Sequence, residues 1–183
     1  SQVACRQALY RHNPGVLSNM KKLVAAEIRS TAPPTGVIGA NARIVGCPAI
    51  TNVIIGPFAR CEGAALLENG TINSCPEHPT VVGSGVHARE FIFSEGSRVE
   101  SGALVERAFV GQGVKMGKQY SAENSLYFAN CEMFHGEGVS LFAGPYTVSH
   151  HKSPLMIAGI FSFYNAGSGT NQSNHMYKLG PVH

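Results

Sequence analysis

Charge is scarce in this sequence. Only 14% of the 183 residues are charged, and the net charge of +3 comes without a cluster of lysine and arginine. Proteins that bind nucleic acid usually gather basic residues on one face, so the composition excludes that class of partner. No apolar run approaches the ~20 residues that a membrane-spanning helix needs, and the first residues lack the pattern of a signal peptide. We therefore expect neither a nucleic-acid partner nor a membrane partner.

The cysteines do not form the patterns of a metal site or a disulfide framework. There are five, an odd number, and no two of them form a C-x-x-C pair. Structural zinc sites use such pairs, so no metal site is predicted. We interpret Cys61 as a buried core thiol, and reduced thiols indicate a cytoplasmic protein.

Glycine is abundant, with 21 residues, and it takes part in a repeat. The run Ile38–Arg43 returns as Ile55–Arg60, with echoes that begin at Val82 and Val110. Three consecutive units of six, six and five positions make one full repeat, and its length stays constant apart from an insertion of four near Cys75–Pro79. A repeat at fixed spacing describes the whole architecture and outranks other sequence signals.

The first residue of each unit is uncharged and mostly aliphatic. These positions are Ile38, Ile44, Ile50, Ile55, Cys61, Leu67, Ile72, Val82, Ala88, Phe93, Val99, Val105, Val110, Met116, Ala122, Tyr127, Met133 and Val139. One unit makes a short strand and a corner, three sides close a coil, and the next coil pairs with it at roughly 4.8 Å. Glycine, asparagine and serine suit the corners. We predict an all-β fold in which these residues stack inward over Ile38–Ala143.

The units resemble the hexapeptide repeat of left-handed parallel β-helices, whose pattern is an aliphatic residue, a small or acidic one, two free positions and a small one. The resemblance covers Ile38–Ala143 and implies the left hand, which periodicity alone does not determine. The shorter third unit departs from the family pattern. The stretches His150–Pro154 and Gly167–Leu179 also resemble an uncharacterised family of larger bacterial hexapeptide-repeat proteins. Since the sequence also lacks an initiator methionine, we expect a fragment of a longer protein.

Residues 1–36 are predicted to form an N-terminal helical cap, and residues 37–183 the β-helix domain. Asn13 is the expected N-cap, with Pro14 at the first helical position. We expect the apolar helix face to cover the open first coil rather than to bind a partner. That face follows helical spacing and consists of Val16, Leu17, Met20, Leu23, Val24 and Ile28.

The resemblance also implies a function. Hexapeptide-repeat proteins are most often acyltransferases, which move an acyl group from coenzyme A or acyl carrier protein to a hydroxyl or amine, and others are β-helical parts of sugar-nucleotide enzymes. The transferases are usually homotrimers with the site between subunits, and a histidine acts as general base. The resemblance therefore predicts a homotrimer that acts on a sugar or sugar nucleotide, with acetyl-CoA or another acyl donor as substrate.

Histidines gather after Tyr127, and three of them are candidate catalytic residues: His150, His151 and His135. Histidine suits a general base because its unperturbed pKa lies near working pH. In the frame of the repeat His150 takes an inward slot, the first break of the apolar column, and local rules tend to fail at functional sites. The same frame places all three histidines and Lys152 on one face across two coils.

Further residues are predicted to bind the substrate. We expect Lys152 to bind a phosphate or carboxylate, and Asn171, Asn174 and His175 to contact substrate from a polar, glycine-containing stretch. The frame also predicts that His151 lies one coil above Phe134, and that Glu137 orients an imidazole.

Two alternatives stay open. One is a metal site similar to that of γ-class carbonic anhydrases, which share the fold and bind an ion with three histidines; this sequence lacks their closely spaced histidine pair. The other is a non-catalytic scaffold that trimerises or presents another domain of a longer protein. In that case each histidine is a hydrogen-bonded structural residue.

Overall fold

The computed structural model describes residues 6, 9–31, 33, 35–152, 154–157, 159–161, 165, 166, 171 and 172. The chain divides into two compact units, Ser1–Thr35 and Gly36–His183. Among the described residues, no helix is both long enough and apolar enough to cross a membrane.

The first unit contains helix α2 (Pro14–Thr31). The N–H of Val16 donates to Oδ1 of Asn13 at 3.1 Å, which confirms the predicted N-cap and satisfies one of the helix's free donors. None of the residues of α2 is buried, and the apolar side chain of Leu23 is 71% exposed. The prediction that the apolar face of this helix covers the first coil depends on how the two units are arranged, and it stays a prediction.

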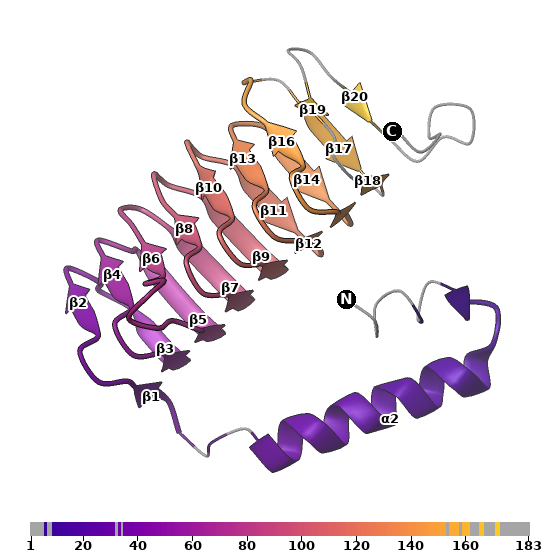
Figure 1. The fold of residues 1–183 in the computed structure, drawn as a ribbon, viewed down its shortest axis with the longest axis horizontal. Helices are drawn as coiled ribbons and strands as arrows, with labels where there is room; N and C mark the ends of the chain where they lie inside the picture. The colour runs from indigo at the N-terminus through magenta and orange to yellow at the C-terminus, as the bar shows by residue number, and fades with distance from the viewer. Residues whose placement is uncertain are drawn as a thin grey trace. The chain divides into compact units, whose positions relative to one another are not determined.

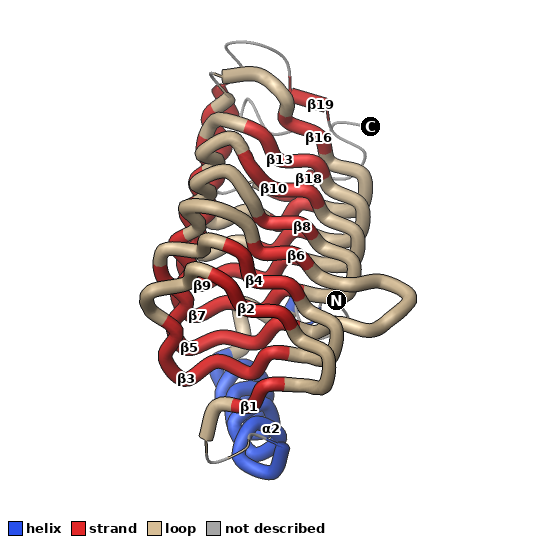
Figure 2. The backbone as a smooth tube through the Cα atoms, turned by 90° about the vertical axis from the view of Figure 1, so that its left-hand side faces the viewer, coloured by secondary structure: helices blue, strands red, loops and turns tan. Residues whose placement is uncertain are grey.

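The second unit is a parallel β-solenoid, which confirms the predicted fold class, and its coils stack in chain order (Figures 1 and 2). We number the three sides of each coil 1 to 3. Side 1 belongs to an eight-stranded sheet. Its strands are β2 (Arg43–Val45), β4 (Arg60–Glu62), β6 (Val81–Val82), β8 (Arg98–Val99), β10 (Lys115–Gly117), β13 (Glu132–Phe134), β16 (Val148–Ser149) and β19 (Asn165–Ala166). The left hand implied by the family resemblance stays a prediction.

Sides 2 and 3 share a twelve-stranded sheet. Four strands span both sides: β3 (Ile50–Ile55), β5 (Leu66–Ile72), β7 (His87–Phe93) and β9 (Leu104–Val110). Side 2 continues with β11 (Ser121–Glu123), β14 (Glu137–Val139), β17 (Leu155–Ile157) and β20 (Asn171–Gln172). Side 3 has β1 (Val37–Ile38), β12 (Leu126–Tyr127), β15 (Phe142–Ala143) and β18 (Ile160–Phe161).

The corner between sides 2 and 3 forms inside the long strands. From Asn52 to Ser140 one residue of each coil there has left-handed backbone, as at Asn52 and Asn69 with φ of 52° and 53°. Asparagine tolerates this conformation better than most residues. Nδ2 of Asn52 also donates to Oδ1 of Asn69 at 2.8 Å, so equivalent corners of successive coils are joined by side chains.

The predicted inward column is confirmed from Ile55 to Met133. Every first residue of a unit in that range is buried. At the start of the stack Ile38 pairs with buried Ile55 and so lies in register with the inward column, but it is 65% exposed. Its strand β1 pairs with β3 alone, so the first coil has a neighbour on only one side and its apolar residues stay open.

The step between coils changes after Phe134. Gly117 pairs with Phe134, a full repeat further on, but Ala122 pairs with Gly138, which lies one position short of a full repeat. We attribute the shorter step to side-chain volume. Tyr120 and Tyr127 are fully buried in the coil below, their hydroxyls are 3.2 Å apart, and a Cβ at Gly138 would lie 2.4 Å from Oη of Tyr120. A coil with one residue fewer, and glycine in the inward slot, leaves room for both rings.

Candidate functional site

The shortened step places His150 differently from the prediction. Met133 pairs with Ser149, so buried Ser149 takes the inward slot and the side chain of His150 is 46% exposed. The inward position predicted for His150 was therefore wrong. The predicted stacking of His151 above Phe134 was also wrong, because His150 is the residue that packs there, with ring centroids 5.2 Å apart.

An acidic side chain orients His150. Nε2 of His150 lies 2.7 Å from Oε2 of Glu132, one coil below on side 1. The other oxygen of Glu132 accepts a hydrogen bond from Nζ of Lys115 at 2.9 Å. The hydrogen bond from Lys115 holds the pKa of Glu132 below its ordinary value, against a smaller opposing effect of burial, and the bond to His150 lowers it further. Glu132 is therefore ionised and keeps accepting from both neighbours at neutral pH.

A shallow hollow adjoins this pair at the corner between sides 1 and 2. It has a volume of about 120 Å³, and its lining includes Phe134, Lys115 and Lys118. Nζ of Lys118 lies 5.1 Å from the centroid of the Phe134 ring, a cation–π distance. Phe134 thus connects the hollow to His150, which packs against the same ring.

The charges around the hollow do not cancel. Arg98 pairs with Glu100 at 2.9 Å and Lys115 with Glu132 at 2.9 Å. Within the part of the chain that the structure describes, Lys118 has no carboxylate partner. The charge of Lys118 is therefore not compensated by these two pairs, which makes the potential near it favourable for an anionic group.

The other predicted site residues are not part of the pair of His150 and Glu132. His135 lies at the corner after β13, with left-handed backbone (φ 59°). His151 and Lys152 are exposed in the bend after β16. Asn171 belongs to β20 and pairs through its backbone with Leu155. Asn174 and His175 lie outside the described residues.

Glu137, which was predicted to orient an imidazole, is exposed on side 2. The residue that meets an imidazole is Glu132 instead. The role of each predicted site residue in binding or catalysis stays a prediction.

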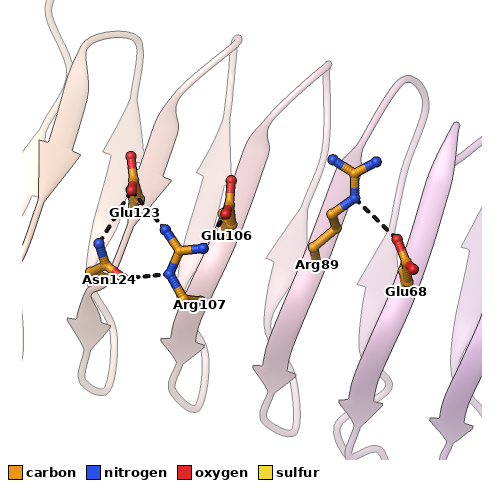
Figure 3. A network of polar contacts seen from close by, with 6 residues as sticks. All are labelled: Glu68, Arg89, Glu106, Arg107, Glu123 and Asn124. Carbon is orange, nitrogen blue, oxygen red and sulfur yellow. Dashed lines mark hydrogen bonds and ion pairs between the residues drawn. The ribbon is translucent and has the colours of Figure 1, made fainter.

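Side 2 carries a separate polar network (Figure 3). Arg89 pairs with Glu68 at 3.1 Å. One coil further, Arg107 contacts Glu106 and pairs with Glu123 at 2.8 Å. These pairs lie on the surface, where water screens them, so they contribute little to stability. The three carboxylates outnumber the two guanidiniums, and Arg89, Glu106 and Glu123 also line a hollow of about 270 Å³ on this side.

A larger hollow lies beside the loop that interrupts the repeat. Its volume is about 520 Å³, and its lining includes His78, Glu95, Gln112 and Asn130. Nε2 of Gln112 donates to Glu95 at 3.2 Å. The hollow is polar, and among the described residues that line it no imidazole is paired with a carboxylate. It therefore offers hydrogen bonds to a ligand without an oriented base. Over the described ranges, no three His, Cys, Asp or Glu side chains lie close enough to hold a metal ion.

Sequence reasoning missed Glu132, Lys115 and Lys118. A signal was present, because Lys115 and Glu132 have opposite charges and stand one full repeat apart. Cross-strand pairs of opposite charge are the expected neighbours in a parallel sheet. The link from Glu132 to His150 does not follow the repeat and depends on the shortened step.

Comparison with known proteins gives the family but no close relative of known structure. None of the curated proteins and none of the solved structures matches the chain. A family model described as a domain of unknown function, DUF4954, matches residues 1–183. Because that match spans the whole sequence, the chain belongs to the DUF4954 family.

Proposed function

We propose that this protein is an acyltransferase of the hexapeptide-repeat type, which transfers an acyl group from a thioester to a small anionic acceptor such as a sugar nucleotide. The observation that carries the proposal is the contact of 2.7 Å between Nε2 of His150 and Glu132. An imidazole oriented by a carboxylate is an arrangement that suits a general base. The solenoid fold and the resemblance to hexapeptide-repeat acyltransferases support the same reaction class.

In this proposal each nitrogen of the imidazole has its own role. With Glu132 ionised, the Nε2–H of His150 donates to it, and the lone pair is on Nδ1. The hydroxyl of the acceptor gives its proton to Nδ1 while its oxygen bonds to the thioester carbonyl carbon. The C–S bond then breaks, the acyl group stays on the acceptor as an ester, and the leaving thiolate takes the proton from the imidazolium.

Lys118 and Phe134 supply the binding surface in this proposal. The ammonium of Lys118 meets a phosphate or carboxylate of the acceptor, and Phe134 offers an apolar face to a ring of the ligand. This replaces Lys152, which the sequence favoured for the anion. Glu132 acts through His150 and is therefore a positioning residue.

The test combines binding with turnover. Acetyl-CoA and a panel of sugar nucleotides are added to the full chain, and the melting temperature and the release of free thiol are measured. We expect a rise in melting temperature and thiol release that depends on an acceptor. His150→Asn should lower the rate by roughly 10²–10⁴-fold with unchanged melting of the free protein.

Two variants complete the test. His87→Asn is the matched control, since His87 is an exposed histidine on side 2, outside the site; it should keep full activity. Glu132→Gln should lower the rate and change its pH profile, because the carboxylate no longer orients the imidazole. The proposal is wrong if acetyl-CoA changes neither the melting temperature nor thiol release, or if His150→Asn and His87→Asn behave alike.

A further inference from the structure

The outward face of side 3 differs from the other two sides in having an uncharged column. One residue of each coil points outward there, and seven of these eight residues are apolar. In stacking order they are Val37, Ile54, Thr71, Ile92, Phe109, Leu126, Phe142 and Ile160. Their outward direction follows from alternation, because the next residue of the strand is buried in every coil from Ile55 to Ala143. We call this column the side 3 stripe.

The positions that follow the stripe residues along the chain, toward the corner with side 1, are also uncharged and mostly small. They are Gly56, Asn73, Ser94, Gly111, Phe128 and Gly144. The one large residue, Phe128, packs against Phe142 with ring centroids 4.7 Å apart and against Phe109 at 5.9 Å. Small neighbours leave the stripe as a flat surface with an aromatic patch at its upper half.

Sides 1 and 2 show that the lack of charge is particular to side 3. The equivalent column of side 1 contains five charged residues, namely Arg43, Arg60, Arg98, Lys115 and Glu132. Side 2 carries the ladder of acidic and arginine side chains in Figure 3. Charged residues keep a sheet face in water, so a face without them is suited to contact.

We propose that the side 3 stripe is the surface through which two copies of this chain pair. The stripe repeats at the coil spacing of roughly 4.8 Å, and a second copy presents apolar residues at the same spacing along the same length. Two identical stripes facing one another require a two-fold axis, at which the same patch serves both partners. A two-fold pair would take the place of the homotrimer that the family resemblance implies.

The area is sufficient for a stable pair. Seven steps between coils make a length of about 34 Å, and one strand with its corner makes a width of about 20 Å. The product is about 700 Å² for each copy, close to the roughly 800 Å² per partner of a standard stable interface. Ile92 at 45% exposure and Ile160 at 69% show that apolar surface is available along the stripe.

The pairing is independent of the proposed catalytic site. His150 lies at the end of side 1, next to the corner with side 2. In a three-sided coil that corner is the one opposite side 3 (Figure 2). Variants of the stripe should therefore change the mass of the protein in solution and leave His150 and Glu132 in place, so failure of either proposal is distinguishable from failure of the other.

The test is the mass of the full chain by light scattering after size exclusion. We expect twice the 19.4 kDa of one chain for the wild type, and a single chain for Ile92→Glu. Leu104→Glu is the matched control, because Leu104 is an apolar residue of similar exposure (48%) that points outward on side 2; this variant should stay paired. If Ile92→Glu does not fold, Ile160→Glu replaces it, because Ile160 is a stripe residue with 69% exposure, and this variant should also have the mass of a single chain.

Three outcomes would overturn the proposal. The first is a wild type with the mass of one chain at every concentration. The second is a mass of three chains, which a contact between two identical stripes does not produce. The third is equal dissociation of the Ile92→Glu and Leu104→Glu variants, which would show that the lost contact does not involve side 3.

Discussion

Gly138 tests whether side-chain volume causes the shortened coil. In Gly138→Ala the added Cβ lies 2.4 Å from Oη of Tyr120, 2.5 Å from Oη of Tyr127 and 2.7 Å from Cδ1 of Leu141. Carbon contacts are optimal at about 3.5–4.0 Å, so both rings must move by about 1 Å. Each ring is fully buried and meets the other edge to face, so the surrounding core resists that movement.

The cost follows from overpacking. Extra methyl groups in a well-packed core destabilise by about 1–3 kcal/mol, and three contacts below 3 Å place Gly138→Ala near the upper end. For a chain of this length, about 3 kcal/mol corresponds to a fall in melting temperature of roughly 6–12 °C. The backbone adds no strain of its own, because Gly138 is not among the residues with positive φ.

The assay is thermal and urea unfolding followed by circular dichroism, with one control and one rescue. Gly83→Ala is the control, since its Cβ meets the flexible side chain of Glu100 at 3.1 Å; it should cost less than about 1 kcal/mol. The rescue places Gly138→Ala in a background with Tyr120→Phe and Tyr127→Phe. That background gives up the hydrogen bond between the two hydroxyls, worth about 1 kcal/mol, and the bond between Tyr127 and Ser125, but it removes the two closest contacts.

Gly138→Ala should therefore cost at least about 1 kcal/mol less in the phenylalanine background than in the wild type. Equal costs in the two backgrounds would refute the reasoning, because the tyrosine hydroxyls would then not be the obstacle. A variant Gly138→Ala as stable as the wild type would show that the core has room and that the short coil has another cause.

Three further predictions concern the core, the Glu132 cluster and the thiols. Val99→Asp places an unpaired charge at a position with no exposed surface and should unfold or aggregate the protein, whereas normal melting would show that the inward column is misassigned. The pKa of Glu132 is lowered chiefly by Lys115, so the stability that the ionised carboxylate contributes is present above the ordinary glutamate pKa and is lost as pH falls through the lowered pKa of Glu132. In urea unfolding at a series of pH values, Glu132→Gln should therefore lose less stability at acid pH than the wild type. An identical pH dependence of the two proteins would contradict this prediction. Burial raises the pKa of Cys61 to about 12, so at mildly alkaline pH an alkylating reagent should modify half-buried Cys75 in the folded protein and spare Cys61, with mass spectrometry as the readout.

The repeat in the sequence determined the solenoid. An aliphatic residue at every sixth or fifth position, with glycine and asparagine between, is a local pattern that each coil satisfies in the same way. For this reason the inward positions from Ile55 to Met133 and the N-cap at Asn13 were predictable. Burial of each of these apolar residues depends mainly on its own coil and the adjacent coils, and little on residues far away in the structure.

The tertiary structure alone decided which residues meet after Phe134. Tyr120 and Tyr127 fill the space above their own coil, so the next coil is one residue shorter and Gly138 takes the inward slot. A slip of one residue turns the side chains that follow to the other face, so Ser149 points inward and His150 points outward to Glu132. The sequence encodes the spacing of the coils but not the volume that a neighbouring coil leaves free, and this volume set the position of the candidate site.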